Sequence, residues 1–153
     1  MTLDTDFHSH VSRSSAYSMA LAAKERGLRV LGLSEHIFQM QEARAPLEHM
    51  ALEGPMMSLP GYIEAVQEAA NKVSLDVRLG LEVDFIPEKD TQISASIQGH
   101  AWDFLIGSVH EVDGELYERD YEMTREHGEA LWIRYFQLLR AAVSSGRHPV
   151  QDR

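Results

Sequence analysis

The sequence Asp6-Phe7-His8-Ser9-His10 closes the first segment of the chain in which apolar and polar residues alternate. Residues two apart in a β-strand point to the same face, so both imidazoles face one side at the end of a strand predicted over residues 2–8. Two imidazoles on one face can bind the same metal ion. The pair alone is weak support for a site, because eight histidines among 153 residues sometimes fall two apart by chance.

Three further segments have the pattern of buried parallel strands, being short, mostly apolar and bounded by Gly or polar residues. These are residues 28–33, 77–85 and 102–110. Amphipathic helices are predicted between the strands and after the last one, at residues 18–26, 58–72, 88–99 and 128–145. The order of elements predicts an α/β fold with a parallel sheet and right-handed crossovers.

Two long segments lack a sustained hydrophobic period. Residues 37–57 are predicted to form a long loop or lid with room for a turn of helix. Residues 111–127 are predicted to form an acidic loop with a turn at Asp113-Gly114. The helix that follows is expected to bury a stripe of apolar side chains, namely Leu131, Trp132, Tyr135, Leu138, Leu139, Ala142 and Val143.

Composition limits the class of protein. The 153 residues favour a single domain over residues 1–153, with an irregular tail at 146–153. The chain has no cysteine, so imidazole and carboxylate groups must hold any metal. The net charge of −10 disfavours nucleic acid as a partner. No apolar run could span a bilayer and no signal peptide is visible, so we expect a cytoplasmic protein without a membrane partner.

The four predicted strands end in HSH, SEH, GLEVD and GSVH. Parallel α/β folds place their chemistry at the carboxyl ends of the strands, so these groups are expected to meet. Together they supply four imidazoles and a carboxylate, enough to hold two divalent ions with the carboxylate as a bridge. The candidate metal ligands are His8, His10, His36, Glu82 and His110. Zinc, manganese and iron all suit such ligands.

In this order, DFHSH, GLSEH, GLEVDF and GSVH resemble the first motifs of the PHP (polymerase and histidinol phosphatase) superfamily of metal-dependent phosphoesterases, especially its histidinol-phosphate phosphatase branch. The resemblance covers residues 4–145. It implies a distorted (β/α)7 TIM-like barrel of which about the first four β/α units are present, with two or three divalent metal ions. It also implies hydrolysis of L-histidinol phosphate to L-histidinol and phosphate by a metal-activated hydroxide, in histidine biosynthesis.

The resemblance also assigns the ligands to individual ions. His8, His10 and Glu82 match the ligands of one metal, Glu82 and His110 match those of a second, and His36 matches a ligand of a third. Where relatives often have a further histidine, this chain has Ser14-Ser15-Ala16-Tyr17, so the third metal is expected to be held weakly.

The later family motifs are a histidine after the fifth strand and a DxH near the C-terminus. The sequence contains no such DxH, so it resembles a C-terminally truncated form with weak or absent catalysis. His148 could stand for the later histidine, but no apolar strand precedes it and a solvated tail is the favoured interpretation. His49, His100 and His127 have no strand-end context and are assigned to surface or loop positions.

Other polar residues near the motifs are candidates for supporting roles. Asp6, Glu35 and Asp84 lie beside predicted ligands and could orient imidazoles, or they could be solvated carboxylates. Arg13 and Arg119 are best placed to bind the phosphate of a small phosphorylated metabolite, since an arginine fork matches phosphate oxygens. Ordinary surface charge is the alternative interpretation of both arginines.

Two other functions stay open. One is a nuclease or nucleotide phosphoesterase of the same superfamily, against which the acidic composition counts. The other is a non-catalytic metal-binding module or a subunit whose partner completes the barrel. Four strands of a barrel would leave an open sheet edge and apolar helix faces, through which a homo-oligomer could form.

Overall fold

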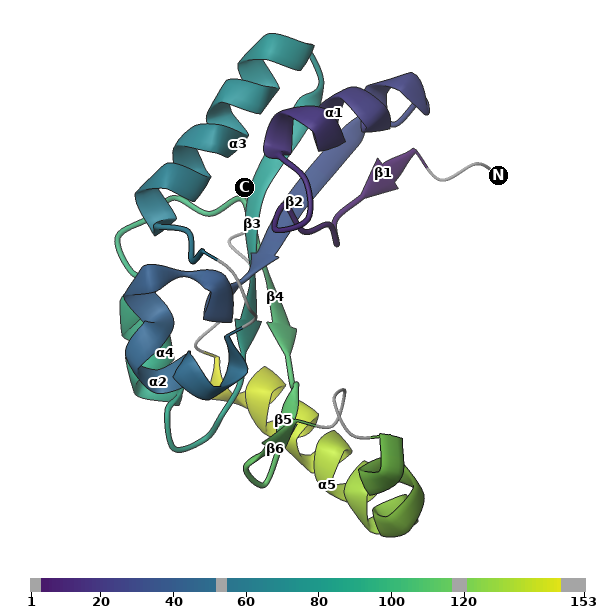
Figure 1. Cartoon of the computed structure of the whole chain (residues 1–153), viewed down its shortest axis with the longest axis vertical. Helices are drawn as coiled ribbons and strands as arrows, with labels where there is room; N and C mark the ends of the chain where they lie inside the picture. The colour runs from purple at the N-terminus through teal and green to yellow at the C-terminus, as the bar shows by residue number, and fades with distance from the viewer. Residues whose placement is uncertain (1–3, 52–54, 117–120, 147–153) are drawn as a thin grey trace.

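The computed structural model of the chain describes residues 4–51, 55–116 and 121–146, with side chains from residue 128 onward in the last range. A four-stranded parallel sheet with the order β1-β2-β3-β4 forms its centre (Figure 1). The strands are β1 (Thr5–Asp6), β2 (Val30–His36), β3 (Asp76–Asp84) and β4 (Phe104–Ser108). The predicted mixed α/β architecture with a parallel sheet is confirmed.

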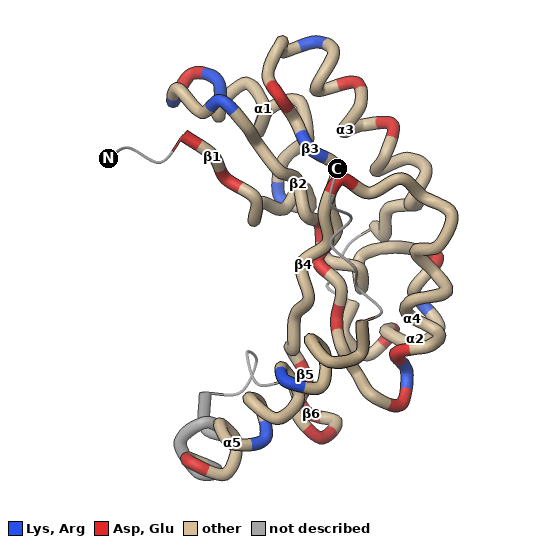
Figure 2. The backbone as a smooth tube through the Cα atoms, turned by 180° about the vertical axis from the view of Figure 1, so that it is seen from behind, with Lys and Arg blue, Asp and Glu red and all other residues tan. Residues whose placement is uncertain are grey.

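The register of the sheet brings the carboxyl ends of the strands to one side. His36 on β2 pairs with Glu82 on β3, and Asp84 on β3 pairs with Ser108 on β4. Strand β1 has only two residues, so the HSH motif lies just beyond its end instead of within the strand. The sheet curls, with β1 and β4 at its two ends (Figure 2).

Helices α1 (Ala16–Glu25) and α3 (Leu59–Val73) lie side by side against the sheet (Figure 1). The side chain of Ser15 accepts the backbone N–H of Ser18 and caps α1, so the helix begins two residues before the predicted start at residue 18. Gly27 follows the helix with φ +81°, a conformation that glycine adopts without strain, and α1 ends at Glu25, one residue before the predicted end.

The boundaries of helix α3 each lie one residue from the predicted range 58–72. Ser58 caps its first turn by accepting the N–H of Gly61, and Pro60 lies in that turn, where its missing N–H costs nothing. The buried stripe repeats every three or four residues and consists of Leu59, Tyr62, Val66, Ala69 and Val73. Helix α4 (Asp90–Ser96) is shorter than the predicted segment 88–99.

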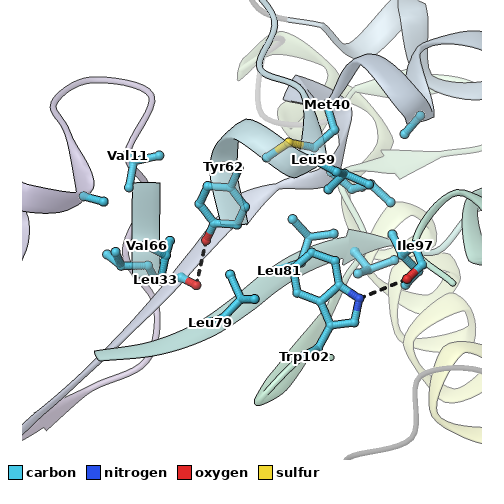
Figure 3. Packing of buried hydrophobic residues seen from close by; sticks show 14 of the residues in the cluster. Val11, Leu33, Met40, Leu59, Tyr62, Val66, Leu79, Leu81, Ile97 and Trp102 are labelled. Atoms are coloured by element: carbon cyan, nitrogen blue, oxygen red, sulfur yellow. Dashed lines mark hydrogen bonds between the residues drawn. The ribbon is translucent and has the colours of Figure 1, made fainter. Parts of the chain in front are cut away.

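The main core lies between the sheet and these helices (Figure 3). Leu33 and Leu81 project from β2 and β3 into it and are fully buried. Tyr62 is 1% exposed, and its hydroxyl lies 2.8 Å from the carbonyl oxygen of Leu33 and 3.0 Å from that of Gly80. One side chain of α3 therefore bridges the two central strands.

Residues 37–57, predicted as a long loop or lid with room for a turn of helix, contain more helical turns than predicted in the part that the structure describes. This segment contains the short helical turns η1 (Ile37–Gln39), η2 (Gln41–Ala43), α2 (Arg44–Leu47) and η3 (Glu48–Met50). Ile37, Met40 and Leu47 are completely buried within it. The short turns run in different directions, so the apolar residues that they bury are irregularly spaced in the sequence. This is why the segment shows no regular hydrophobic period.

The segment after β4 also differs from the predicted loop at 111–127. Strands β5 (Glu111–Val112) and β6 (Glu115–Leu116) form a two-stranded hairpin. Its turn residues, Asp113 and Gly114, have φ of 52° and 92°, as a type I′ turn requires. Helix α5 (Tyr121–Ser145) begins before the predicted residue 128 and kinks at Gly128, whose φ of 44° is not helical.

Helix α5 buries only part of the predicted stripe. Leu131 and Leu138 are buried beside Phe85 and Val109 in a second, smaller cluster. Trp132 and Val143, which were predicted to be buried, are 47% and 85% exposed. The sequence pattern identified the helix, but the described residues supply too little surface to cover its whole apolar face.

The concave face of the sheet carries two aromatic rings over two glycines. The rings of Phe7 and Phe104 meet edge to face with centroids 5.1 Å apart. A Cβ on Gly32 would lie 2.6 Å from the ring of Phe7, and one on Gly80 would lie 2.2 Å from the ring of Phe104. The rings can approach the sheet this closely only because neither position carries a side chain.

Candidate metal centre

Four imidazoles converge on one carboxylate at the carboxyl ends of the strands. Oε2 of Glu82 lies 3.0 Å from Nε2 of His8, 3.1 Å from Nδ1 of His36 and 3.6 Å from Nε2 of His10. Oε1 of the same carboxylate lies 3.4 Å from Nε2 of His110. The structure therefore brings together all five residues that the sequence predicts as metal ligands.

Alternation along the strands explains this convergence. Gly80, Glu82 and Asp84 share the concave face of β3, while Leu81 and Val83 point into the core. His36 occupies the matching position on β2 because it pairs with Glu82. The centre consequently lies two residues further along the strands than the layer of Phe7 and Phe104.

The electrostatics of the centre favour a cation. Burial raises the pKa of Glu82, but the surrounding His36, His110 and His8 outweigh burial and lower the pKa to about 2. Burial and the neighbouring His36 lower the pKa of His10. At neutral pH the carboxylate is therefore ionised, and the lowered pKa of His10 favours the neutral imidazole whose lone pair can bind a metal.

The donor atoms form two groups that fit divalent ions. His8, His10 and Glu82 make one group and His36, Glu82 and His110 the other, with the donor atoms of each group within 4.8 Å of one another. Nδ1 of His10 is buried and has no hydrogen-bond partner among the described residues, since the Oε1 of Glu35 lies 3.8 Å away. Buried polar atoms are normally satisfied, so such an orphaned nitrogen fits a site that holds metal.

Stacking fixes the orientation of the central imidazole. The ring of His36 stacks on that of His10 with centroids 4.0 Å apart and on that of Phe38 with centroids 4.5 Å apart. His36 lies beside Glu82 and His110, and its assignment to a third metal is still a prediction.

Carboxylates contact the candidate ligands from outside. Oδ1 of Asp84 lies 2.7 Å from Nδ1 of His110, so an Nδ1–H donated to Asp84 leaves Nε2 available for a metal. Glu35, fully buried, accepts the backbone N–H groups of Ser12 and His36 at 2.6 and 2.9 Å and thereby joins the loop after HSH to β2. Asp6 accepts the N–H of His8 at 3.0 Å and shapes the turn at the motif.

We expect Asp84→Asn to weaken metal binding about tenfold or more, because an amide oxygen holds the Nδ1–H of His110 less strongly than a carboxylate. Burial raises the pKa of Asp84, and the hydrogen bond from His110 opposes that rise. Competitive titration with a chelating indicator would measure the affinity. The exposed Asp76→Asn is the control, and equal affinity in both variants would rule out this role for Asp84.

Of the other residues named from the sequence, the structure describes only some. Arg13 is exposed on the loop before α1, while Arg119 and His148 lie outside the described residues. The side chain of His127 is also not described.

Basic residues Lys24, Arg26 and Arg29 surround the turn between α1 and β2, at the opposite end of β2 from the centre (Figure 2).

Sequence reasoning missed one contact near the centre. Nε2 of His49, on η3, contacts Oε2 of Glu111, the residue that directly follows His110. His49 lies in a segment without hydrophobic period, so the position of Glu111 directly after GSVH was the one sequence signal near this contact.

Comparisons with known proteins show the family of the chain. The chain belongs to the PHP domain family, whose model matches residues 4–147. Over 134 residues it is 34% identical to a protein of Deinococcus radiodurans named "Probable histidinol-phosphatase", with 83% of this chain and 49% of that protein aligned. The chain thus spans about half the length of this curated relative. Of the described helices, none combines the length and apolar character needed to cross a membrane.

Proposed function

We propose that the protein is a metal-dependent phosphomonoester hydrolase whose substrate is L-histidinol phosphate. The convergence of four imidazoles on the carboxylate of Glu82 carries this proposal. Family membership and the name of the relative support the reaction class and the substrate, respectively. A place in histidine biosynthesis and a cytoplasmic location go with that substrate.

In this proposal the four parallel strands are the first four of a distorted (β/α)7 barrel. His8, His10 and Glu82 hold one divalent ion, and His36, Glu82 and His110 hold another, with zinc, manganese and iron as candidates. Such ions acidify a water to give the nucleophile and neutralise phosphoryl charge. The chain itself orients the ligands. Asp84 contacts the imidazole of His110, and the ring of Phe38 stacks on that of His36.

Metal removal and replacement test the proposal. We expect chelation to abolish phosphate release from L-histidinol phosphate, and Zn²⁺, Mn²⁺ or Fe²⁺ to restore it and to raise the melting temperature, since an ion bound only by the folded state stabilises it. Malachite-green detection and differential scanning fluorimetry provide the measurements. Cleavage of a short oligonucleotide in preference to L-histidinol phosphate would favour the nuclease interpretation.

A second candidate function is a metal-binding subunit that a partner completes. The exposed apolar side chains of α5 favour it, since Trp132, Ile133 and Phe136 are 47%, 52% and 60% exposed. Metal binding without phosphate release, together with a mass above that of one chain in light scattering, would support this function instead.

A further inference from the structure

Glu35 is a carboxylate in the interior of the protein. It lies near the end of β2 and is completely buried, and an ion in such a place is costly unless neighbouring groups compensate its charge. Its Oε2 accepts the backbone N–H of Ser12 at 2.6 Å, and its Oε1 accepts that of His36 at 2.9 Å. Among the described residues, its ion-pair contact is with His10, whose Nδ1 lies 3.8 Å from Oε1. Two hydrogen bonds therefore hold the buried carboxylate in place beside this imidazole.

The imidazole of His10 lies between two carboxylates. Oε1 of Glu35 is on the side of Nδ1, while Nε2 lies 3.6 Å from Oε2 of Glu82. An imidazole that binds a metal through one ring nitrogen carries its proton on the other, and the hydrogen bond that this proton makes fixes the orientation of the ring. Which nitrogen of His10 can bind a metal thus depends on which carboxylate receives the proton.

The two carboxylates differ in how many imidazoles they contact. Besides His10, Glu82 contacts three imidazoles at 3.0, 3.1 and 3.4 Å, those of His8, His36 and His110. Among the described residues, Glu35 forms an ion-pair contact with His10 alone. A proton on Nδ1 of His10 therefore compensates the charge of Glu35 and leaves the lone pair of Nε2 to the candidate metal centre. The distance of 3.8 Å exceeds that of a hydrogen bond, so we expect it to shorten when a cation is bound.

Other hydrogen bonds hold the loop after the HSH motif to β2 without this carboxylate. The N–H of Ser9 donates to Oγ of Ser34 at 3.3 Å, and the N–H of Ser34 donates to the carbonyl oxygen of Ser9 at 2.9 Å. The hydroxyl of Tyr62 accepts the N–H of Glu35 itself at 3.3 Å. Removal of the charge of Glu35 is therefore expected to affect the ring of His10 more than the fold.

We propose that Glu35 is a positioning residue for metal binding, which accepts the Nδ1–H of His10 and so presents Nε2 of that ring to the ion. The inference rests on the proposed function, because it assumes that a metal is bound at the candidate centre. It goes further in assigning Glu35 to one of the two donor groups, the one that His10 forms with His8 and Glu82. The other donor group has its own outer carboxylate, that of Asp84.

The position of the proton can be measured in the wild-type chain. In long-range ¹H–¹⁵N NMR spectra of the chain labelled with ¹⁵N-histidine and loaded with Zn²⁺, we expect the ring of His10 to be protonated at Nδ1 and bound to the metal through Nε2. The spectrum of His10→Gln identifies the signals of this ring by their loss. A ring of His10 that binds Zn²⁺ through Nδ1, or that keeps both protons, would overturn the proposal.

Glu35→Gln tests the contribution of the charge. We expect the Zn²⁺ ion that shifts the signals of His10 to bind about tenfold or more weakly, because an amide oxygen holds the Nδ1–H less strongly than a carboxylate. The ion that shifts the signals of His110 should keep its affinity within about twofold. Competition with a chelating indicator measures both affinities. Glu25→Gln, the same change at an exposed position of α1, is the matched control and should alter neither.

A merely structural role of Glu35 has a different outcome. It would weaken both ions equally and lower the melting temperature of the metal-free chain, and this result would refute the positioning role. Glu35→Asp keeps the charge and should retain more of the affinity than Glu35→Gln. The NMR measurement on the wild-type chain decides the question if neither variant folds.

The two proposals can fail separately. Losses confined to the ion that shifts the signals of His10, without phosphate release from L-histidinol phosphate by the wild type, would refute the proposed function and retain the role of Glu35. Metal-dependent phosphate release, with equal Zn²⁺ affinities in Glu35→Gln and the wild type, would refute the role of Glu35 and retain the function.

Discussion

Glu82→Gln is expected to lower phosphomonoesterase activity roughly a hundredfold or more and to remove most of the bound metal, which is a larger loss than that expected from an outer carboxylate. The Glu82 carboxylate belongs to both donor groups, so its charge serves either ion. An amide of the same shape removes that charge while keeping the volume. The expected loss thus reflects electrostatics and coordination, with little change in packing.

Metal content by plasma mass spectrometry and phosphate release would be measured on the same preparations. Glu64→Gln, the same substitution on the exposed side of α3, should match the wild type in both measurements. Retention of metal and activity in Glu82→Gln would exclude a bridging role. Loss of metal in both variants would instead indicate a general effect of lowering the negative charge.

Tyr62→Phe is expected to lower the free energy of unfolding by about 2 kcal/mol, or roughly 6 °C in melting temperature. The hydroxyl accepts the N–H of Glu35 at 3.3 Å and faces the carbonyl oxygens of Leu33 and Gly80. Burial raises the pKa of Tyr62 far above its ordinary range, so the hydroxyl keeps its proton and remains a donor. Phenylalanine would leave these buried backbone groups without that partner.

Tyr17→Phe provides the control, because Tyr17 is 48% exposed and its hydroxyl can be replaced by water. Urea denaturation followed by circular dichroism would measure both variants. A change of less than about 0.5 kcal/mol in Tyr62→Phe would show that the strands β2 and β3 satisfy these groups without the tyrosine.

The sequence was sufficient to predict the parallel strands and the residues at their ends. Alternation places Glu82 and Asp84 on one face of β3, and a parallel sheet brings the ends of successive strands to the same side. Meeting of the five candidate ligands follows from these two local rules. Their role as ligands was inferred from the motifs and is still a prediction.

Contacts between segments without a period could not be predicted in the same way. Residues 37–50 bury Ile37, Met40 and Leu47 through short turns, and nothing local specifies which neighbour each of them contacts. The contact of His49 with Glu111 joins residues 62 positions apart and depends on how these turns pack. The exposure of Trp132 likewise depends on how much surface is present to cover α5.

The two rings on the concave face link positions that are far apart in the chain. Phe7 and Phe104 occupy the space that side chains at Gly32 and Gly80 would otherwise fill. The side chains at the four positions therefore share one volume, and a larger side chain at one position requires a smaller one at another. For protein engineering, this makes the layer beneath the candidate centre a single unit of design: enlarging either glycine calls for a smaller residue in place of the facing ring.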